Sequence, residues 1–397
     1  MRFTAKPRKL FLVFFLGLLA WSFSGCATSH PRSSLHLSGD PLIDGPIAIA
    51  QGPPEDRLLW KYRMAAAALR RGKWDLARGA LDDAVQRLQN LFGPDPRAKK
   101  ARSLFGRESQ KFFVGEPYER VMAWYYRGIL YWRDGEPDNA RACFRSAQLM
   151  DAYAEDQEYV ADYVLLDYLD GLITEKLGGD GKPMYERARK HARLAIPPPI
   201  NPHWNVFFFL EYGKGPLKYA TGTHREQLRF LPGVSKAKEV KIYVDHKAVH
   251  VGPYDDLYYQ ATTRGGRPID YILGRKAVFK DVTDVGGTGA MVSGVILATR
   301  RRTQEVGLAL LAAGLLSKVV SAAVHPEADT RTWDNLPLYL SFAAFQLPPG
   351  RYTARVEFLD KKRRVLPDLT KEIHFEVVPG KDKVLFVSDQ SITPMEQ

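Results

Sequence analysis

The apolar positions between residues 57 and 194 recur with a helical period, and the pattern itself repeats along the chain. We expect small residues at positions 128 and 140 to let two helices approach closely, with aromatic residues filling the wedge between them. A glycine then marks the turn that joins the two helices. The clearest copy of this pattern consists of Trp124, Gly128, Tyr131, Gly135, Ala140, Phe144 and Ala147.

Two further copies of the pattern align on other glycines. The first has its turn at Gly72, 63 residues before Gly135, and a looser copy has its turn at Gly178. Residues 92–117, which include a basic stretch, are interpreted as a degenerate or inserted unit. Three consecutive prolines at residues 197–199 end the helical section.

Beyond these prolines the period changes to that of β-strands. Residues 206–210 form an apolar run that predicts a buried strand, and residues 240–251 alternate around a turn at 245–247. Alternation returns near the C-terminus, over segments separated by turns at residues 361–364 and 379–381. These segments predict a small antiparallel sheet or sandwich over residues 197–397. The expected fold class is therefore α+β, with the helices first and the strands second.

An apolar region interrupts the strands at about residues 286–324. It contains three glycines within residues 286–289, three arginines at 300–302, and a run rich in small residues from 306 to 324. Lys318 lies inside that run, so neither apolar stretch is a convincing transmembrane helix. We favour a buried helical pair packed on the sheet, and the alternative is a hairpin that enters a bilayer.

The N-terminus has the features of a secretory signal peptide. Residues 1–25 carry four basic residues and no acidic residue, and an apolar run occupies positions 10–23. The following Ser24-Gly25-Cys26 resembles the lipobox of bacterial lipoproteins, although Phe23 stands where an aliphatic residue is usual. This resemblance implies cleavage before Cys26, lipidation of its sulfur and acylation of the new amine, and Ala27 favours the outer membrane. Several acyl chains together anchor a soluble body, so we expect residues 26–54 to be a lipidated flexible tether.

Charge and cysteine content limit the possible partners and bonds. The chain of 397 residues has a formal net charge of +12, and loss of the signal peptide would leave +8, of which +6 lies on residues 201–397. For an exported protein this modest excess does not predict nucleic-acid binding. Once Cys26 is lipidated, Cys143 is the only remaining thiol, so an intramolecular disulfide is excluded.

The sequence carries no recognisable enzyme motif. It contains no His-Glu-x-x-His, no Gly-x-Ser-x-Gly, no Cys-x-x-Cys and no Walker-type loop. His246 and His250 are four residues apart, but they flank a predicted turn and no third ligand is indicated. We therefore expect no catalytic residue, metal or cofactor. Seven acidic residues between Asp151 and Asp170 predict a solvated helix face, with an acidic docking strip as the alternative.

The helical pattern closely resembles the tetratricopeptide repeat (TPR). The resemblance implies an α-solenoid over residues 55–196, whose concave groove is built from the first helix of each repeat. Tyr, Trp and Arg often dominate protein interfaces, so the groove is a candidate partner-binding site. The alternative, given equal weight, is that its residues pack against the C-terminal continuation of the same chain. The groove positions are Leu59, Tyr62, Ala66, Leu69 and Arg70 in the first copy, and Met122, Tyr125, Ile129, Trp132 and Arg133 in the second.

The mature chain also resembles a family of uncharacterised bacterial envelope lipoproteins that join TPRs to a β-rich end. The resemblance is carried by residues 115–120, 213–218, 329–337 and 348–352. It transfers no catalytic residue to this chain. We expect Asp329, Arg331 and Trp333 to form a structural corner, in which an Arg–carboxylate pair stacks on the indole, in preference to a ligand site.

Together these features predict a non-enzymatic lipoprotein of the outer membrane that faces the periplasm. It would act as a scaffold or assembly factor, binding an unknown envelope protein through its TPR groove. One alternative is a secretion or channel-associated component whose residues 286–324 contact the membrane. Another is a module that binds cell-wall glycan.

Overall fold

The computed structural model describes residues 37–92, 112–151, 162–263 and 327–397. Within these ranges the chain forms eight α-helices and three sheets, which confirms the expected α+β class. Cys26, the basic stretch at residues 97–107 and the apolar region at residues 286–324 lie outside the described residues. The helices are α2 (Pro41–Gln51), α3 (Arg57–Arg70), α4 (Trp74–Phe92), α6 (Pro117–Arg133), α7 (Pro137–Asp151), α8 (Val164–Lys176), α9 (Lys182–His191) and α10 (Leu257–Thr262).

Six of these helices form three consecutive pairs, in which α3 packs on α4, α6 on α7 and α8 on α9. The glycines aligned by the repeat pattern lie at the three turns. Gly72, Gly135 and Gly178 have φ angles of 65°, 86° and 81°, a region that glycine adopts without strain. The amide that follows each glycine bonds back into its helix, from Lys73 to Ala68, from Glu136 to Tyr131 and from Gly179 to Thr174. The pairing of helices at these glycines therefore agrees with the prediction.

Helices α6 and α7 approach closely where the pattern places small residues. A Cβ atom at Gly128 would lie 2.5 Å from Cε1 of Phe144. Ala140 and Phe144 are fully buried, and Tyr131 is partly buried against the same core. The expected wedge of aromatic residues between the two helices is present.

The strands form a four-stranded, a five-stranded and a two-stranded sheet. The four-stranded sheet has the order β10-β1-β7-β6, with β1 at Val206–Tyr212, β6 at Asp255–Asp256, β7 at Tyr339–Phe345 and β10 at Lys383–Ser388. The five-stranded sheet has the order β11-β9-β8-β4-β5, with β4 at Glu239–Val244, β5 at Lys247–Val251, β8 at Gly350–Leu359, β9 at Lys371–Val377 and β11 at Met395–Glu396. The two-stranded sheet is a ribbon of β2 (Leu217–Thr221) and β3 (Gln227–Leu231).

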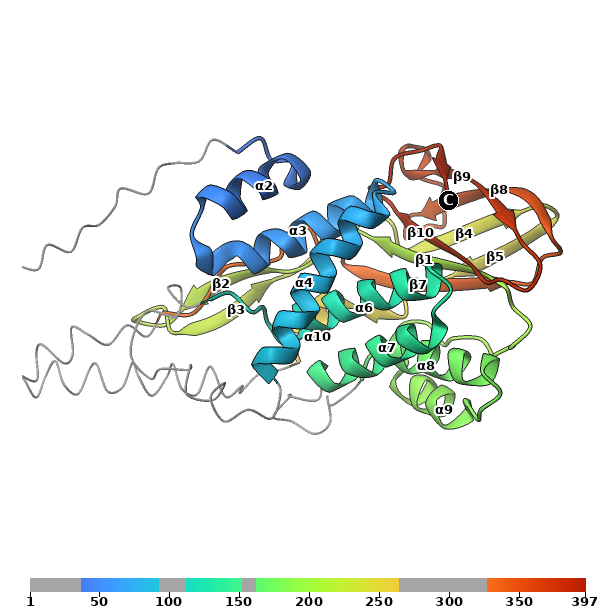
Figure 1. Cartoon of the computed structure of the whole chain (residues 1–397), viewed down its shortest axis with the longest axis horizontal. Coiled ribbons are helices and arrows are strands. Elements are labelled where there is room, and N and C mark those ends of the chain that lie inside the picture. The colour runs from blue at the N-terminus through green and yellow to red at the C-terminus, as the bar shows by residue number, and fades with distance from the viewer. Residues whose placement is uncertain (1–36, 93–111, 152–161, 264–326) are drawn as a thin grey trace, which may run out of the picture. The chain divides into compact units, whose positions relative to one another are not determined.

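Strand β1 contributes to two cores, one on each of its faces. All seven of its residues are buried, as the apolar run predicted. Phe208 faces the five-stranded sheet, where its ring lies 6.1 Å from that of Phe375. Phe207 and Phe209 face the helices and pack against Trp132 of α6. Figure 1 shows β1, β7 and β10 beside helices α6 and α8.

The two larger sheets are mixed and not purely antiparallel, which corrects the expectation from the sequence. Strand β10 runs parallel to β1, and β11 runs parallel to β9. The turn at residues 379–381 leads from β9 in one sheet to β10 in the other, so these consecutive strands belong to different sheets. Alternation indicates which side chains share a face but does not identify the neighbouring strand, so this pairing was not predictable from the pattern.

Residues Ser38–Gln397 form one compact unit. One core contains residues from both sides of the boundary expected between residues 196 and 197, and helix α10 follows that boundary. Within residues 26–54, which were expected to form a flexible tether, Pro41–Gln51 form helix α2. The carboxylate of Asp40 accepts a hydrogen bond from the amide of Leu42 at 3.0 Å, and Pro41 occupies the first turn, so this helix has a capped start.

Candidate functional site

All but one of the side chains predicted to line a partner groove lie inside the molecule. Those of Tyr62, Met122, Ile129 and Trp132 have no exposed surface, and Tyr125 and Arg70 are 2% and 5% exposed. The ring of Trp132 lies 4.5 Å from that of Phe207, and the ring of Tyr125 lies 6.2 Å from that of Phe209. Arg133 is partly exposed, and its guanidinium stacks on Trp74 at 4.2 Å. Tyr125 and Trp132 thus follow the second of the two alternatives, in which the groove packs against the C-terminal continuation of the chain, whereas Arg133 does not.

A buried ion pair joins the end of α3 to β1. Nε of Arg70 donates to Oε1 of Glu211 at 2.6 Å, and the hydroxyl of Tyr126 donates to Oε2 at 2.5 Å. Burial, together with the neighbouring Glu211 carboxylate, raises the pKa of Tyr126 well above its usual value, so the phenol remains a neutral donor. Arg70, a candidate partner-binding residue, is therefore engaged by the chain's own strand.

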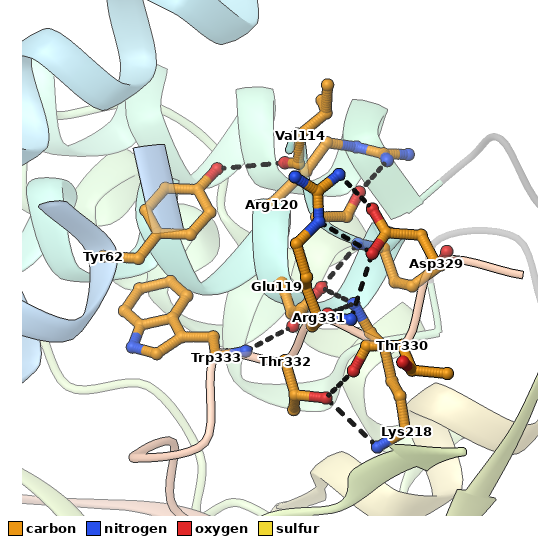
Figure 2. A network of polar contacts seen from close by, with 12 residues as sticks. Tyr62, Val114, Glu119, Arg120, Lys218, Asp329, Thr330, Arg331, Thr332 and Trp333 are labelled. Atoms are coloured by element: carbon orange, nitrogen blue, oxygen red, sulfur yellow. Dashed lines mark hydrogen bonds and ion pairs between the residues drawn. The ribbon is translucent and has the colours of Figure 1, made fainter. Parts of the chain in front are cut away.

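Three of the segments that carry the family resemblance meet around the buried carboxylate of Glu119, as Figure 2 shows. Nζ of Lys218 lies 2.5 Å from Oε2 of Glu119, and the amide of Trp333 donates to Oε1 at 2.8 Å. The amide of Glu116 also donates to Oε2, at 2.6 Å. The side chains of Glu119 and Lys218 are 0% and 2% exposed. The segments at residues 115–120, 213–218 and 329–333 therefore belong to one network.

Arg331 extends this network towards Asp56 and Asp329. Its guanidinium donates to the two carboxylate oxygens of Asp329 at 2.9 and 2.6 Å and to Asp56 at 2.7 Å. The expected Arg–carboxylate pair is thus present. The indole of Trp333 does not stack on it, because it lies against the ring of Tyr62 at 4.4 Å and 16° (Figure 2). The corner joins α3, α6 and β2, so its geometry is that of a structural junction.

The charged groups of Glu119 and Lys218 form their hydrogen bonds with other residues of this network. Both oxygens of Glu119 accept hydrogen bonds, and Nζ of Lys218 also donates to the carbonyl of Arg331 at 2.9 Å.

Cys143 is buried elsewhere, and burial raises the pKa of its thiol to about 12, which disfavours the nucleophilic thiolate. No group of three His, Cys, Asp or Glu side chains in the described ranges could hold a metal ion.

The acidic residues of the run between residues 151 and 170 that lie in the described ranges do not form the solvated face that we expected, and residues 152–161 lie outside those ranges. Asp167 and Asp170 are 1% and 2% exposed. Oδ1 of Asp167 accepts from Arg187 of α9 at 3.0 Å, and Oδ2 of Asp170 accepts from Arg145 of α7 at 3.0 Å. These carboxylates therefore connect α8 to its neighbours. The arginines that pair with them lie outside the acidic window, which is why the local sequence suggested a solvated face.

The ribbon of β2 and β3 presents an apolar face to solvent. Leu217 and Leu231 are opposite each other and are 42% and 49% exposed. Tyr219, opposite Arg229, is 38% exposed. The other face contains Lys218, which reaches Glu119. Alternation around residue 218 is a usable strand signal, but hydrophobicity alone would have placed Leu217 and Tyr219 in the core and Lys218 outside, so the sequence did not reveal this surface.

No protein-family model, curated protein or solved structure matches the chain. Among the helices within the described ranges, none combines the length and apolar character needed to cross a membrane. A functional assignment therefore depends on the chain's own residues.

Proposed function

We propose that the chain is a lipid-anchored, non-enzymatic protein of the bacterial envelope that acts as a scaffold or assembly factor. Acylated Cys26 holds it in the outer membrane, facing the periplasm. Its partner is another envelope protein, and the partner-binding surface is the exposed face of the β2–β3 ribbon. The observation that carries this proposal is the apolar face formed by Leu217, Tyr219 and Leu231.

The helix pairs form the framework that holds this ribbon. We propose that they are a TPR-like solenoid whose concave face contacts the four-stranded sheet, and that the two larger sheets form a sandwich-like arrangement. Support comes from the three glycine turns and from the core shared by helices and strands. The contact of Glu119 on α6 with Lys218 on β2 then fixes the ribbon to the framework.

The charges around the ribbon indicate the chemistry of the partner. Lys214, Arg225 and Lys236 are exposed around it, whereas Glu226 is 8% exposed. Complementary charge steers association and selects partners, and aromatic and apolar side chains supply much of the affinity. The surface therefore fits a protein with an apolar centre and an acidic rim.

Crosslinking in intact cells tests the ribbon assignment. A full-length variant with Leu217, Tyr219 and Leu231 all changed to Ser keeps the lipid anchor and removes only exposed apolar groups. We expect the partner captured by the wild-type protein to be lost from this variant, as measured by affinity purification and mass spectrometry.

The matched control changes three other exposed apolar residues, Leu76, Val378 and Ile392, to Ser. These residues lie outside the ribbon, so the control should capture the same partner as the wild-type protein. Equal capture by both triple variants would contradict the ribbon assignment. Circular dichroism of each variant would verify that it is folded.

Metabolic labelling with a fatty acid tests the anchor separately. We expect label on the wild-type protein and on Cys143→Ser, and none on Cys26→Ser, because the acyl chains depend on the residue at the cleavage junction. Persistent labelling of Cys26→Ser would refute the anchor without bearing on the ribbon.

A further inference from the structure

A cavity of about 220 Å³ lies where the start of α8, the end of α9 and helix α10 meet. Asp162 and Val164 line it from the start of α8, and His191 from the end of α9. Tyr254 and Tyr259 line it from the segment that contains β6 and α10. The lining residues are separate from the network around Glu119 and from the exposed face of the ribbon.

Two of the carboxylates in the cavity wall are used by helix ends. The two oxygens of Asp255 accept hydrogen bonds from the amides of Val164 and Leu165, both at 2.9 Å. Oδ1 of Asp256 accepts from the amide of Tyr258 at 2.8 Å. These carboxylates cap α8 and α10, so their positions are explained by the fold.

Asp162 differs from its two neighbours. It is 7% exposed, and neither of its carboxylate oxygens has a hydrogen-bond partner in the described part of the chain. Burial raises the pKa of Asp162, and the nearby side chains of Gln260 and Tyr259 partly oppose this rise. Neither side chain meets the geometry of a hydrogen bond to the carboxylate. Nδ1 of His191, in the same wall, is also buried without a partner. Buried polar groups are nearly always satisfied, so this carboxylate points to a ligand that supplies a donor.

We propose that this cavity binds a small organic ammonium group, with Asp162 as its anionic anchor. An ammonium supplies three donors and a positive charge to the unpartnered carboxylate. Tyr254, Val164 and Leu194 also line the cavity and provide apolar surface for an alkyl chain. The volume is below that of pockets for drug-sized molecules, so the ligand is small.

The other charged groups of the wall are consistent with an organic cation. Asp255 and Asp256 are committed to helix ends, so they do not complete a cluster of metal ligands with Asp162. The guanidinium of Arg193 stacks on the ring of Tyr259 at 4.2 Å and donates to its hydroxyl at 3.2 Å. Arg193 is exposed, and it does not hydrogen-bond to the Asp162 carboxylate.

Titration of the full mature chain with n-butylamine, followed by NMR, tests the proposal. We expect saturable binding of n-butylamine and none of n-butanol, which has the same size without the charge. N-acetyl-lysine N-methylamide carries the same ammonium as a lysine side chain of a protein. Tighter binding of n-butylamine would identify the source as a free amine, and tighter binding of the lysine derivative would identify it as a protein lysine. Either result supports recognition of an ammonium group.

The Asp162→Asn variant keeps the shape of the side chain and removes its charge. We expect the dissociation constant of Asp162→Asn for n-butylamine to be at least tenfold larger than that of the wild-type protein. Asp138→Asn, at an exposed site on α7, should bind n-butylamine as the wild-type protein does. The proposal is overturned if n-butylamine and n-butanol bind equally, if neither amine binds, or if Asp162→Asn retains wild-type affinity. The comparison of n-butylamine with n-butanol tests recognition of the ammonium group on the wild-type protein, even if the variant does not fold.

Discussion

Lys218 lies on the buried face of β2, and its ammonium is held by the carboxylate of Glu119. Removing one partner of a buried pair leaves the other charge without compensation, which typically costs about 3–5 kcal/mol. We therefore expect Lys218→Met to lower the free energy of unfolding by about that amount. Urea unfolding followed by circular dichroism measures it.

The double variant Lys218→Met/Glu119→Gln separates loss of the pair from loss of packing. Because it removes both charges, it should recover part of the stability lost in Lys218→Met. Arg364→Met removes a largely exposed arginine that pairs with Asp360, and its stability should stay near the wild-type value. Similar losses for Lys218→Met and Arg364→Met would show that the buried pair has no special weight.

Asp255 makes stability depend on pH. Burial raises its pKa from 3.8 to about 7, although the amides of Leu165 and Val164 partly oppose the shift. Between these pH values the folded state binds more protons than the unfolded state, so this group's contribution to stability falls as the pH rises from about 4 to about 7.

Asp255→Asn removes this titration. The stability of the wild-type protein relative to the variant should therefore be greater at pH 4.5 than at pH 7.5, as measured from urea unfolding at both values. Any part of the substitution's effect that does not depend on pH cancels when the two pH values are compared. A difference that does not change with pH would contradict the shifted pKa.

At the scale of elements, two helical glycines have opposite environments. A Cβ atom at Gly128 would lie 2.5 Å from Cε1 of Phe144, whereas one at Gly79 in α4 would meet no atom within 4 Å. We expect Gly128→Ala to destabilise the protein by about 1–3 kcal/mol through overpacking. Gly79→Ala should stabilise it by about 0.5–1 kcal/mol, because alanine favours the helix. Thermal unfolding of the two variants checks both signs, and equal effects would show that contact with Phe144 is unimportant.

The same elements show how far the sequence predicts this fold. Helix pairs, turn glycines and β1 were predictable because each depends on local spacing or on an apolar run. The parallel pairing of β1 with β10 was not, since alternation does not select a neighbour. Among the candidate site residues, the groove positions of α3 and α6 were identified as an apolar surface, but its occupant, β1, lies far along the chain. In the sequence Asp162 stood out only as one of seven acidic residues, because its burial without a partner depends on contacts between segments far apart along the chain.

At the scale of the whole molecule, helices and strands share one core. Trp132 illustrates this, because its ring contacts Phe207 and its Nε1 donates to Asp382 at 2.8 Å. A separable helical domain with a free groove would unfold independently of the strands. A shared core predicts a single cooperative transition, in which secondary-structure and tertiary signals in circular dichroism disappear together.

Trp132→Ala distinguishes these two arrangements. We expect it to lower the free energy of unfolding by about 3–5 kcal/mol, because it leaves a large cavity between α6 and β1. Tyr219→Ala, on the exposed face of the ribbon, should instead leave stability nearly unchanged and weaken partner capture. If Trp132→Ala kept wild-type stability and lost the partner, the groove would be a binding surface after all. The predicted contrast between these two aromatic residues follows from their positions, one inside the shared core and the other on its surface.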